Sequence, residues 1–409
     1  MKTFKMCAAA AALILVSAAC GELIDRDPDN PYKALELTTK SVEYARQGNT
    51  FAIDFIDRVN TAENGDFIIS PLSMQFLLGL LLDGAQGQTA EEICKVLGYG
   101  AGETAAVNEY CLSMLEQLPS LDKQTKLSIA NAIFVNNKYP ILDSYSSTVG
   151  KYFKAEVSNL DFSNAASSLN TINGWCSQKT NGMIPKVLDK VEPGMLAYLL
   201  NALYFKSEWK DKFPKGNTSD ETFTTENGQQ KKVPMMKNGK SYPYQDNDDF
   251  RAVRIPYGNS AFSMTVILPA KGKTLSGVTA AIKKADWETF THSMVMCDVD
   301  LWLPKFETKY EKKLNDLLSD MGMPTAFSAS ADFKAMSNYA LCLSFVKQDA
   351  IIKVDEEGTE AAAVSSAGMR ATAVAPGEHV VFHADQPFLY FITETSTGAI
   401  LFAGKYTGK

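Results

Sequence analysis

The sequence has little of the chemistry from which enzymes build catalytic and metal sites. It contains only 3 histidines in 409 residues, with no Gly-x-Ser-x-Gly elbow, no His-Glu-x-x-His pair and no glycine-rich phosphate loop. Serine hydrolases and zinc proteases therefore have no support. His379 and His383 have a spacing that suits metal ligation on a helix, but Val380-Val381-Phe382 between them favours a strand, where residues so placed lie well apart. We expect a protein that is not an enzyme and that holds no metal or cofactor.

Long hydrophobic runs are also absent. The apolar stretch of residues 8–16 follows a basic start and is too short to span a bilayer. With Ser17-Ala18-Ala19-Cys20 it has the form of a bacterial lipoprotein signal, in which Cys20 is lipidated and becomes the new N-terminus. Plain secretion is the alternative. We expect residues 1–19 to be a lipoprotein signal peptide and residues 20–35 to be an acidic tether.

The predicted lipid anchor indicates where the protein lies. Gly21 follows Cys20, so the aspartate that retains many lipoproteins at the inner membrane is missing. We expect a bacterial outer-membrane lipoprotein that is attached to the membrane by its lipid and faces the cell surface and extracellular space. An orientation toward the periplasm is the alternative.

Cysteine is scarce, with 7 residues in the chain. Once Cys7 is removed with the signal and Cys20 is lipidated, five remain: Cys94, Cys111, Cys176, Cys297 and Cys342. This odd number without short pairs argues against a disulfide framework or a zinc site. We expect the five thiols to act as small buried hydrophobes.

Clusters of positive charge are missing too. The 40 Lys and Arg residues are scattered, and with 47 Asp and Glu they leave a net charge of −7, so we expect no nucleic-acid partner. The content of 45% hydrophobic and 21% charged residues is ordinary for a globular protein. No linker, repeat or low-complexity segment follows the tether. Residues 36–409 are therefore expected to form a single, monomeric domain.

Helical periodicity is strongest in the first part of the chain. Apolar residues recur at helical spacing at Phe51, Phe55, Ile56 and Val59. Residues 72–82 are apolar almost all round, which predicts a buried helix. Thr89 and Glu92 have the spacing of a capping box, and Gly98 ends the helix that follows.

Strand-like patterns dominate the later part. They occupy residues 129–135, 199–205, 253–255, 262–268, 341–345, 351–354, 388–392 and 399–403. Early helices and late, long strands predict an α+β fold with large, mainly antiparallel sheets.

The stretch after Gly358 carries an unusual pattern. Nearly every side chain to Gly368 is small, so the segment cannot anchor itself by burial and should be exposed. It still alternates with a period of two: one set, from Thr359 to Met369, is small or apolar, whereas the other carries the charges. Such a segment can be a loop in one state and a central strand in another. Asp355-Glu356-Glu357 ahead of it is interpreted as a solvated charge cluster.

The run that joins this stretch closely resembles the hinge of inhibitory members of the serpin family. It consists of Glu356, Glu357, Gly358, Thr359, Glu360, Ala361, Ala362 and Ala363. The resemblance extends over nearly the whole chain after the tether. Its other motifs are Ser70-Pro71-Leu72-Ser73, Asn131-Ala132-Ile133-Phe134-Val135, Ile172-Asn173-Gly174-Trp175, Asn201-Ala202-Leu203-Tyr204-Phe205-Lys206, Val233-Pro234-Met235-Met236, Leu303-Pro304-Lys305-Phe306 and Asp385-Gln386-Pro387-Phe388. So many motifs in order resemble inhibitory bacterial serpins, in particular the miropin-like surface serpins of gut and oral bacteria.

The resemblance implies both a fold and a mechanism. The fold has eight to nine helices around three mainly antiparallel sheets, with an exposed reactive-centre loop at about residues 358–377. The implied function is suicide inhibition: a target serine protease attacks the loop, forms an acyl-enzyme, and is trapped covalently when the cut loop inserts into the main sheet. Papain-like cysteine proteases are secondary candidate targets. A non-inhibitory serpin that binds or carries a ligand is the alternative, but such members usually have charged or bulky hinge residues.

Family spacing from Gly358 places the scissile bond between Thr372 and Ala373. A small β-branched Thr suits elastase-like and subtilisin-like proteases. The rival bond, Arg370-Ala371, would suit trypsin-like proteases.

The resemblance also assigns residues that control opening of the main sheet. They are Ser70, Ser73, Asn201, Trp209 and Gln348. Gln348 stands where the family commonly has a histidine that bonds the equivalents of Ser70 and Asn201; an amide can also donate and accept, but it has no pH sensitivity. Ser207 stands where the family usually has glycine.

Overall fold

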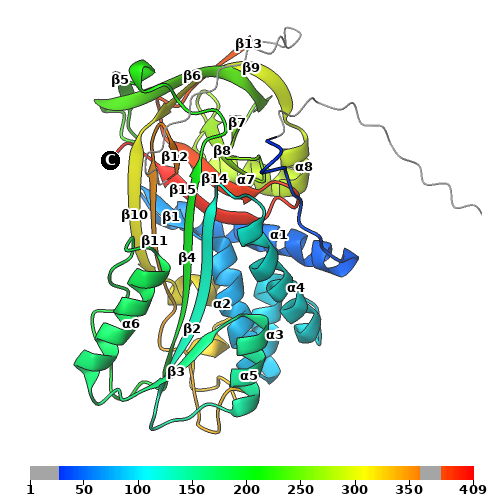
Figure 1. The fold of residues 1–409 in the computed structure, drawn as a ribbon, viewed down its shortest axis with the longest axis vertical. Coiled ribbons are helices and arrows are strands. Elements are labelled where there is room, and N and C mark those ends of the chain that lie inside the picture. The colour runs from blue at the N-terminus through cyan, green and yellow to red at the C-terminus, as the bar shows by residue number, and fades with distance from the viewer. Residues whose placement is uncertain (1–26, 360–378) are drawn as a thin grey trace, which may run out of the picture.

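The computed structural model describes residues 27–359 and 379–409 (Figure 1). The α-helices in these residues are α1 (Thr39–Ala62), α2 (Pro71–Gly84), α3 (Gly87–Leu97), α4 (Thr104–Gln117), α5 (Asp143–Tyr152), α6 (Ala165–Lys179), α7 (Leu275–Ala285), α8 (Trp287–His292) and α9 (Asn315–Met321). The strands are β1 (Phe67–Ile69), β2 (Lys126–Asn136), β3 (Glu156–Leu160), β4 (Ala197–Glu208), β5 (Ser219–Thr224), β6 (Gln230–Asp246), β7 (Phe250–Pro256), β8 (Phe262–Pro269), β9 (Val295–Pro304), β10 (Phe306–Lys313), β11 (Lys347–Val354), β12 (Gly358–Thr359), β13 (His379–His383), β14 (Phe388–Glu394) and β15 (Ile400–Tyr406). The predicted α+β class and helix number are confirmed.

The strands form two hydrogen-bonded networks. One has the order β10-β11-β12-β4-β2-β3, and the other has the order β1-β15-β14-β8-β7-β6-β9-β13, with β5 also paired to β6. The family resemblance predicts three sheets, but the 17-residue β6 pairs with β5, β9 and β7 along its length and so joins two layers into one network. In Figure 1, β2, β4, β10 and β11 run along the long axis of the molecule, and β5, β6 and β9 lie near one end.

Alternating side chains bury both faces of the sheet that contains β2. Ile133 and Val135 belong to the main core, whereas Ala132 and Phe134 belong to a second core beneath α6. This alternation follows from the two-residue period of a strand. The sheet therefore lies between the main helical layer and α6, as Figure 1 shows.

The helix predictions hold for α1 and α2 but fail at the start of α3. Helix α3 begins at Gly87, and its first residue has no side-chain cap. Thr89 instead accepts a hydrogen bond from the Asp332 backbone N–H (2.9 Å), and Glu92 accepts two from Thr325 (2.9 and 2.7 Å). The capping-box prediction is wrong because distant partners take up both side chains. Gly98 ends the helix with a positive φ of 78°, as predicted.

One strand prediction also fails. Residues 341–345 form no strand, although Leu343 donates its N–H to the Ala326 carbonyl (2.8 Å). The cysteines in the described residues are free thiols, as predicted, and four are buried, but Cys342 in this irregular segment is exposed. Among the described helices, none is long and apolar enough to cross a membrane.

Residues 27–37 lie against the body of the domain. Asn30 is buried, donates to Asp122 Oδ1 (2.7 Å) and accepts the Lys123 N–H (3.0 Å). Glu36 exchanges two backbone hydrogen bonds with the side chain of Gln117. These contacts fix the end of the segment that the sequence predicts to be a tether.

Candidate functional site

The hinge enters the sheet between β4 and β11 as the short strand β12. Gly358 and Thr359 pair with Glu208 and Ser207 of β4, and Thr359 also pairs with Val354 of β11. The Thr359 side chain is only 2% exposed, and its hydroxyl is hydrogen-bonded to that of Tyr257 (2.5 Å). The first inward-facing position of the predicted alternation is therefore already a strand residue within the sheet.

Gly358 is required by close packing. A Cβ atom at this position would lie 2.1 Å from the backbone oxygen of Ser207, which is far inside van der Waals contact. The Ser207 side chain is buried, and its hydroxyl is hydrogen-bonded to the Thr125 hydroxyl (2.7 Å). The Thr125 hydroxyl in turn donates to the Asp122 carboxylate (2.7 Å). The serine that replaces the usual glycine of the family thus fits without an unpaired polar group.

Glu356 and Glu357 are held by ion pairs, so the interpretation as a solvated charge cluster is wrong. Glu356 has a side-chain exposure of 8%, accepts a hydrogen bond from Thr218 (2.8 Å) and pairs with Lys305 (2.7 Å). Burial opposes ionisation of Glu356, but hydrogen bonds from Lys305, from its own backbone N–H and from Thr218 outweigh it and hold its pKa below the ordinary value. Hydrogen bonds from Lys212 (2.9 Å) and Lys215 (3.0 Å) likewise lower the pKa of Glu357.

Trp209 holds the chain just before the hinge. Its ring stacks on Tyr257 at 4.5 Å between centroids, and its indole N–H donates to the Asp355 carbonyl (2.8 Å). Its backbone N–H donates to the Glu357 carbonyl (2.8 Å), and the Phe213 N–H donates to the Glu356 carbonyl (3.0 Å). The turn of residues 355–358 is therefore fixed through its backbone as well as its carboxylates.

Beyond Thr359 the sheet has a gap. Among the described residues, β4 and β11 are joined only through the two residues of β12. Three cavities of about 20, 30 and 260 Å³ follow one another along this gap, lined first by 203–205 and 351–353, then by 199–203 and 347–350, and last by 196–200 and 340–347. Most of the lining side chains are apolar. The cavities follow the line that an added strand would take, but β4 and β11 must separate further to admit one, since volumes of about 20 and 30 Å³ hold no more than about one water each.

A polar network lies beneath the gap and contains four of the five residues predicted to control sheet opening, all except Trp209. Gln348 accepts the Ser70 N–H (3.1 Å) and donates to the Ser70 carbonyl (2.9 Å). Ser73 donates to Asn201, which donates to Asn131 (2.7 Å). The Gln348 amide thus contacts the backbone of Ser70 and not its hydroxyl, and among the described residues no hydrogen bond joins it to Asn201. The roles of these residues in sheet opening stay predictions.

Several predicted site residues lie outside the described residues. They are the hinge residues Glu360, Ala361, Ala362 and Ala363, the candidate scissile residues Thr372, Ala373, Arg370 and Ala371, and the lipidation candidate Cys20. Sequence reasoning missed Tyr257 and Thr218, which contact the hinge from distant elements and carry no motif. Lys305 lies within the quoted motif Leu303-Pro304-Lys305-Phe306, but nothing in the sequence identifies it as the partner of Glu356.

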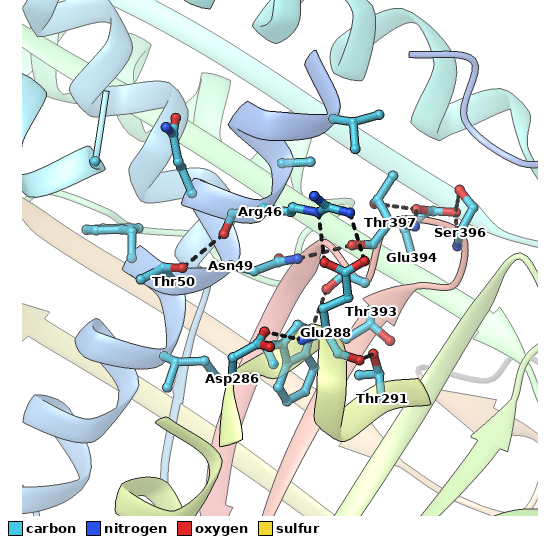
Figure 2. A pocket seen from close by; sticks show the side chains of 18 of the residues that line it. Arg46, Asn49, Thr50, Asp286, Glu288, Thr291, Thr393, Glu394, Ser396 and Thr397 are labelled. Carbon is cyan, nitrogen blue, oxygen red and sulfur yellow. Dashed lines mark hydrogen bonds and ion pairs between the residues drawn. The ribbon is translucent and has the colours of Figure 1, made fainter. Parts of the chain in front are cut away.

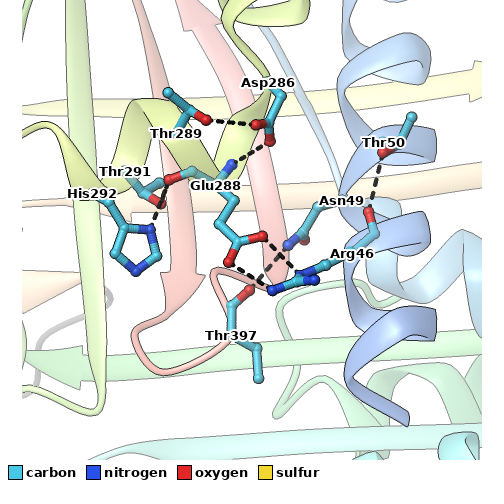
Figure 3. Close-up of polar contacts among 9 residues, drawn as sticks. All are labelled: Arg46, Asn49, Thr50, Asp286, Glu288, Thr289, Thr291, His292 and Thr397. Atoms are coloured by element: carbon cyan, nitrogen blue, oxygen red, sulfur yellow. Dashed lines mark hydrogen bonds and ion pairs between the residues drawn. The ribbon is translucent and has the colours of Figure 1, made fainter. Parts of the chain in front are cut away.

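A second hollow, of about 690 Å³, lies between α1, α8 and the turn that joins β14 to β15 (Figure 2). Arg46 of α1 spans it to Glu288 of α8 (Nε–Oε2 2.7 Å), and Asn49 donates to the Thr397 carbonyl (3.1 Å), as Figure 3 shows. Arg254 also lines the hollow and donates to the Thr291 carbonyl (2.8 Å), but it has no ion-pair partner among the described residues. Partial burial lowers the pKa of Arg254.

Comparisons with known proteins agree over almost the whole domain. A family model described as serpin (serine protease inhibitor) matches residues 46–408. The leukocyte elastase inhibitor of Xenopus laevis is 34% identical over 370 residues, which cover 87% of this chain and 97% of that protein. The native structure of the thermophilic serpin tengpin is 27% identical with a TM-score of 0.82 and covers 93% of this chain and 97% of that one. Human thyroxine-binding globulin complexed with thyroxine is 26% identical, with a TM-score of 0.80 and coverage of 90% and 98%.

Proposed function

The chain belongs to the serpin family, and from this premise we propose that it traps serine endopeptidases covalently, by inserting its cleaved loop into the gap between β4 and β11. In this proposal it acts as a protease inhibitor and supplies no catalytic group of its own. In the proposed mechanism the serine of the target protease attacks the Thr372 carbonyl, an ester forms, and the amine of Ala373 leaves. The loop then becomes a strand between β4 and β11, and distortion of the displaced protease prevents hydrolysis of the ester.

The position of β12 is the observation that carries this proposal. Thr359 already occupies the first place of a new strand in the gap, and the chain beyond it alternates small residues with a period of two. Continued insertion would place those small side chains on one face of the sheet without overpacking its core. A charged or bulky hinge residue would oppose this step.

The target class follows from the residues of the loop. Thr372 followed by Ala373 favours proteases with small specificity pockets, which are elastase-like and subtilisin-like enzymes. The leukocyte elastase inhibitor among the relatives supports this choice. Cysteine proteases are secondary targets. Cleavage at Arg370 would instead select trypsin-like enzymes and leave a shorter strand to insert. Lipidation at Cys20 would present the inhibitor at the outer surface of a bacterium, where it meets such proteases.

Incubation with neutrophil elastase, subtilisin and trypsin tests the proposal. We expect an SDS-stable complex with elastase or subtilisin, and a released C-terminal fragment that begins at Ala373. N-terminal sequencing of that fragment identifies the bond. If each protease cleaved the loop and stayed fully active, the chain would be a substrate and not an inhibitor.

A non-inhibitory carrier is the second candidate function, and the hollow between α1 and α8 favours it. Its volume of about 690 Å³ lies in the range of small-molecule sites, and Arg254 at its wall is a cation that has no ion-pair partner in the described part of the chain. One structural relative is a complex with thyroxine, an iodinated aromatic amino acid whose carboxylate could face a cation. Calorimetric titration with thyroxine, on a sample that is also assayed for protease trapping, separates the two functions. Heat release without trapping would favour the carrier.

A further inference from the structure

The connection between α6 and β4, residues 180–196, contributes lining residues to all three cavities of the gap. Its polar contacts attach it mainly to elements on one side of the gap. Asn173 of α6 accepts the Val187 and Leu188 N–H groups (2.9 Å each), and Asn136 at the end of β2 donates to the Pro193 and Met195 carbonyls. The connection is therefore anchored on the side of α6, β2 and β4.

One side chain of β11, on the opposite side of the gap, is hydrogen-bonded to this connection. Lys347, the first residue of β11, donates its ammonium to the Val187 carbonyl (2.9 Å) and also pairs with Glu311 (2.7 Å) and Asp349 (3.2 Å). Within residues 27–359 and 379–409, this is the one hydrogen bond that we find between the connection and β11. Val187 and Lys347 both line the second and the third cavity, so the tie lies where those cavities meet.

The register of β12 shows where an inserting strand would meet this tie. Thr359 pairs with Val354, and the strands are antiparallel, so each further residue of the loop would lie opposite one residue earlier in β11. Ser366 would come opposite Lys347, about midway between Thr359 and the proposed scissile bond. Beyond that point the rest of the loop, with the attached protease, has to cross a connection that is fastened on both sides. While the hydrogen bond between Lys347 and Val187 is intact, the connection blocks the path of a loop that carries a bound protease.

We propose that the Lys347–Val187 tie is a latch that must open before the loop can insert beyond its midpoint, so that Lys347 sets the rate of the second half of insertion. The inference rests on the proposed function. Lys347 is a positioning residue, because it acts through the connection and touches neither the scissile bond nor the protease. A hydrogen bond to a charged donor of this kind changes an opening equilibrium by roughly tenfold.

The test compares Lys347→Met, which keeps the aliphatic stem, with Lys353→Met, which removes an exposed lysine from the same strand. Hydrogen–deuterium exchange of residues 180–196 reads the tie directly. We expect roughly tenfold faster exchange in Lys347→Met and no change in Lys353→Met. Unchanged exchange in Lys347→Met would show that the lysine does not hold the connection, and it would overturn the proposal.

The second measurement is the rate of insertion. Cleaved chains should gain heat resistance severalfold faster in Lys347→Met, and the moles of inhibitor consumed per protease trapped should fall. Lys347→Met in an Asp349→Asn background must speed insertion by the same factor relative to Asp349→Asn alone, since this pair leaves no unpaired buried carboxylate. Faster exchange without faster insertion would overturn the latch. If the wild type traps no protease, the proposed function fails. The latch is then tested only by comparing how fast the cleaved wild type and the cleaved Lys347→Met variant gain heat resistance.

Discussion

The two ends of the gap between β4 and β11 are built in opposite ways. At the hinge end, Glu356 is paired with Lys305, the Thr359 hydroxyl is bonded to that of Tyr257, and Trp209 holds the backbone. At the far end the strands are separated by a cavity of about 260 Å³. In the second cavity, next to it, one buried carboxylate oxygen of Asp349 has no hydrogen-bond partner among the described residues.

This difference indicates which end of the gap would gain more favourable free energy when a strand inserts. Protein interiors are normally close-packed, so a cavity and an unpaired buried oxygen are both unfavourable and would be relieved by an added strand. The well-paired hinge end would hold the first residue of that strand in register. A satisfied start and an unsatisfied end together favour insertion in one direction.

The largest effect should come from placing a charge at the start of the strand. In Thr359→Arg, a guanidinium replaces a side chain that is 2% exposed, and a buried charge without a partner is strongly unfavourable. Insertion should fail, and the inhibitor should become a substrate. The measurement is the fraction of protease found in SDS-stable complex. Thr359→Val, which loses only the bond to Tyr257, should retain trapping. Equal trapping by the wild type and Thr359→Arg would exclude hinge insertion.

Reversal of the charge at Glu356 should loosen the hinge end next. Glu356→Lys removes the bonds from Lys305 and Thr218 and places two ammonium groups together in a pocket where the carboxylate is 8% exposed. Loss of one partner of such a pair costs about 3 kcal/mol. We expect a lower unfolding temperature and faster proteolysis near residue 356. The double variant Glu356→Lys/Lys305→Glu should recover part of the loss, and if it recovers none, the pair is not the cause.

The sequence predicts the periodic parts of this molecule better than its contacts. Helix α2 and strand β4 could be predicted because their apolar patterns are long and local. The capping box at Thr89 and Glu92 failed because Thr325 and Asp332, more than 200 residues away, supply stronger partners. Local spacing carries no information about such partners.

The candidate site shows the same division. The alternation after Gly358 could be read from the sequence, because a strand buries every second residue. The pairing of Glu356 with Lys305 could not, since the hinge acids resemble a solvated cluster until a separate strand supplies the cation. The gap itself arises from the spacing of β4 and β11, which no single segment encodes.

A pH effect should distinguish the middle of the gap, where Asp349 lines the second cavity, from the rest of the molecule. Burial raises the pKa of Asp349 to about 6 from the ordinary 3.8, although Lys347 opposes the shift. The folded state therefore binds this proton more tightly, and its contribution to stability is complete below the unfolded pKa and is lost as the pH rises through about 6. Asp349→Asn should be more stable than the wild type at pH ~8 by up to about 3 kcal/mol, with the difference vanishing near pH ~4.

Asp83 supplies a matched control for that prediction. Burial raises its pKa to about 6 as well, but it belongs to α2 and lines none of the three cavities of the gap. Asp83→Asn should show the same pH-dependent gain in unfolding temperature without a change in insertion rate. Asp349→Asn should change both. Equal insertion rates in the two variants would mean that the Asp349 carboxylate does not influence the gap.

The smallest effect is expected from the polar network beneath the gap. Gln348→Met keeps the volume but removes the bonds to the Ser70 N–H and carbonyl; the carbonyl still accepts the Met74 N–H, so one buried donor is left unpaired. The expected loss is about 1–2 kcal/mol in the free energy of unfolding. Gln348→His can restore one of the two bonds and should lie between the wild type and Gln348→Met at pH ~8, where the imidazole is neutral. If Gln348→Met were as stable as the wild type, the amide would not join α2 to β11, and resistance to strand separation would reside in the hinge end alone.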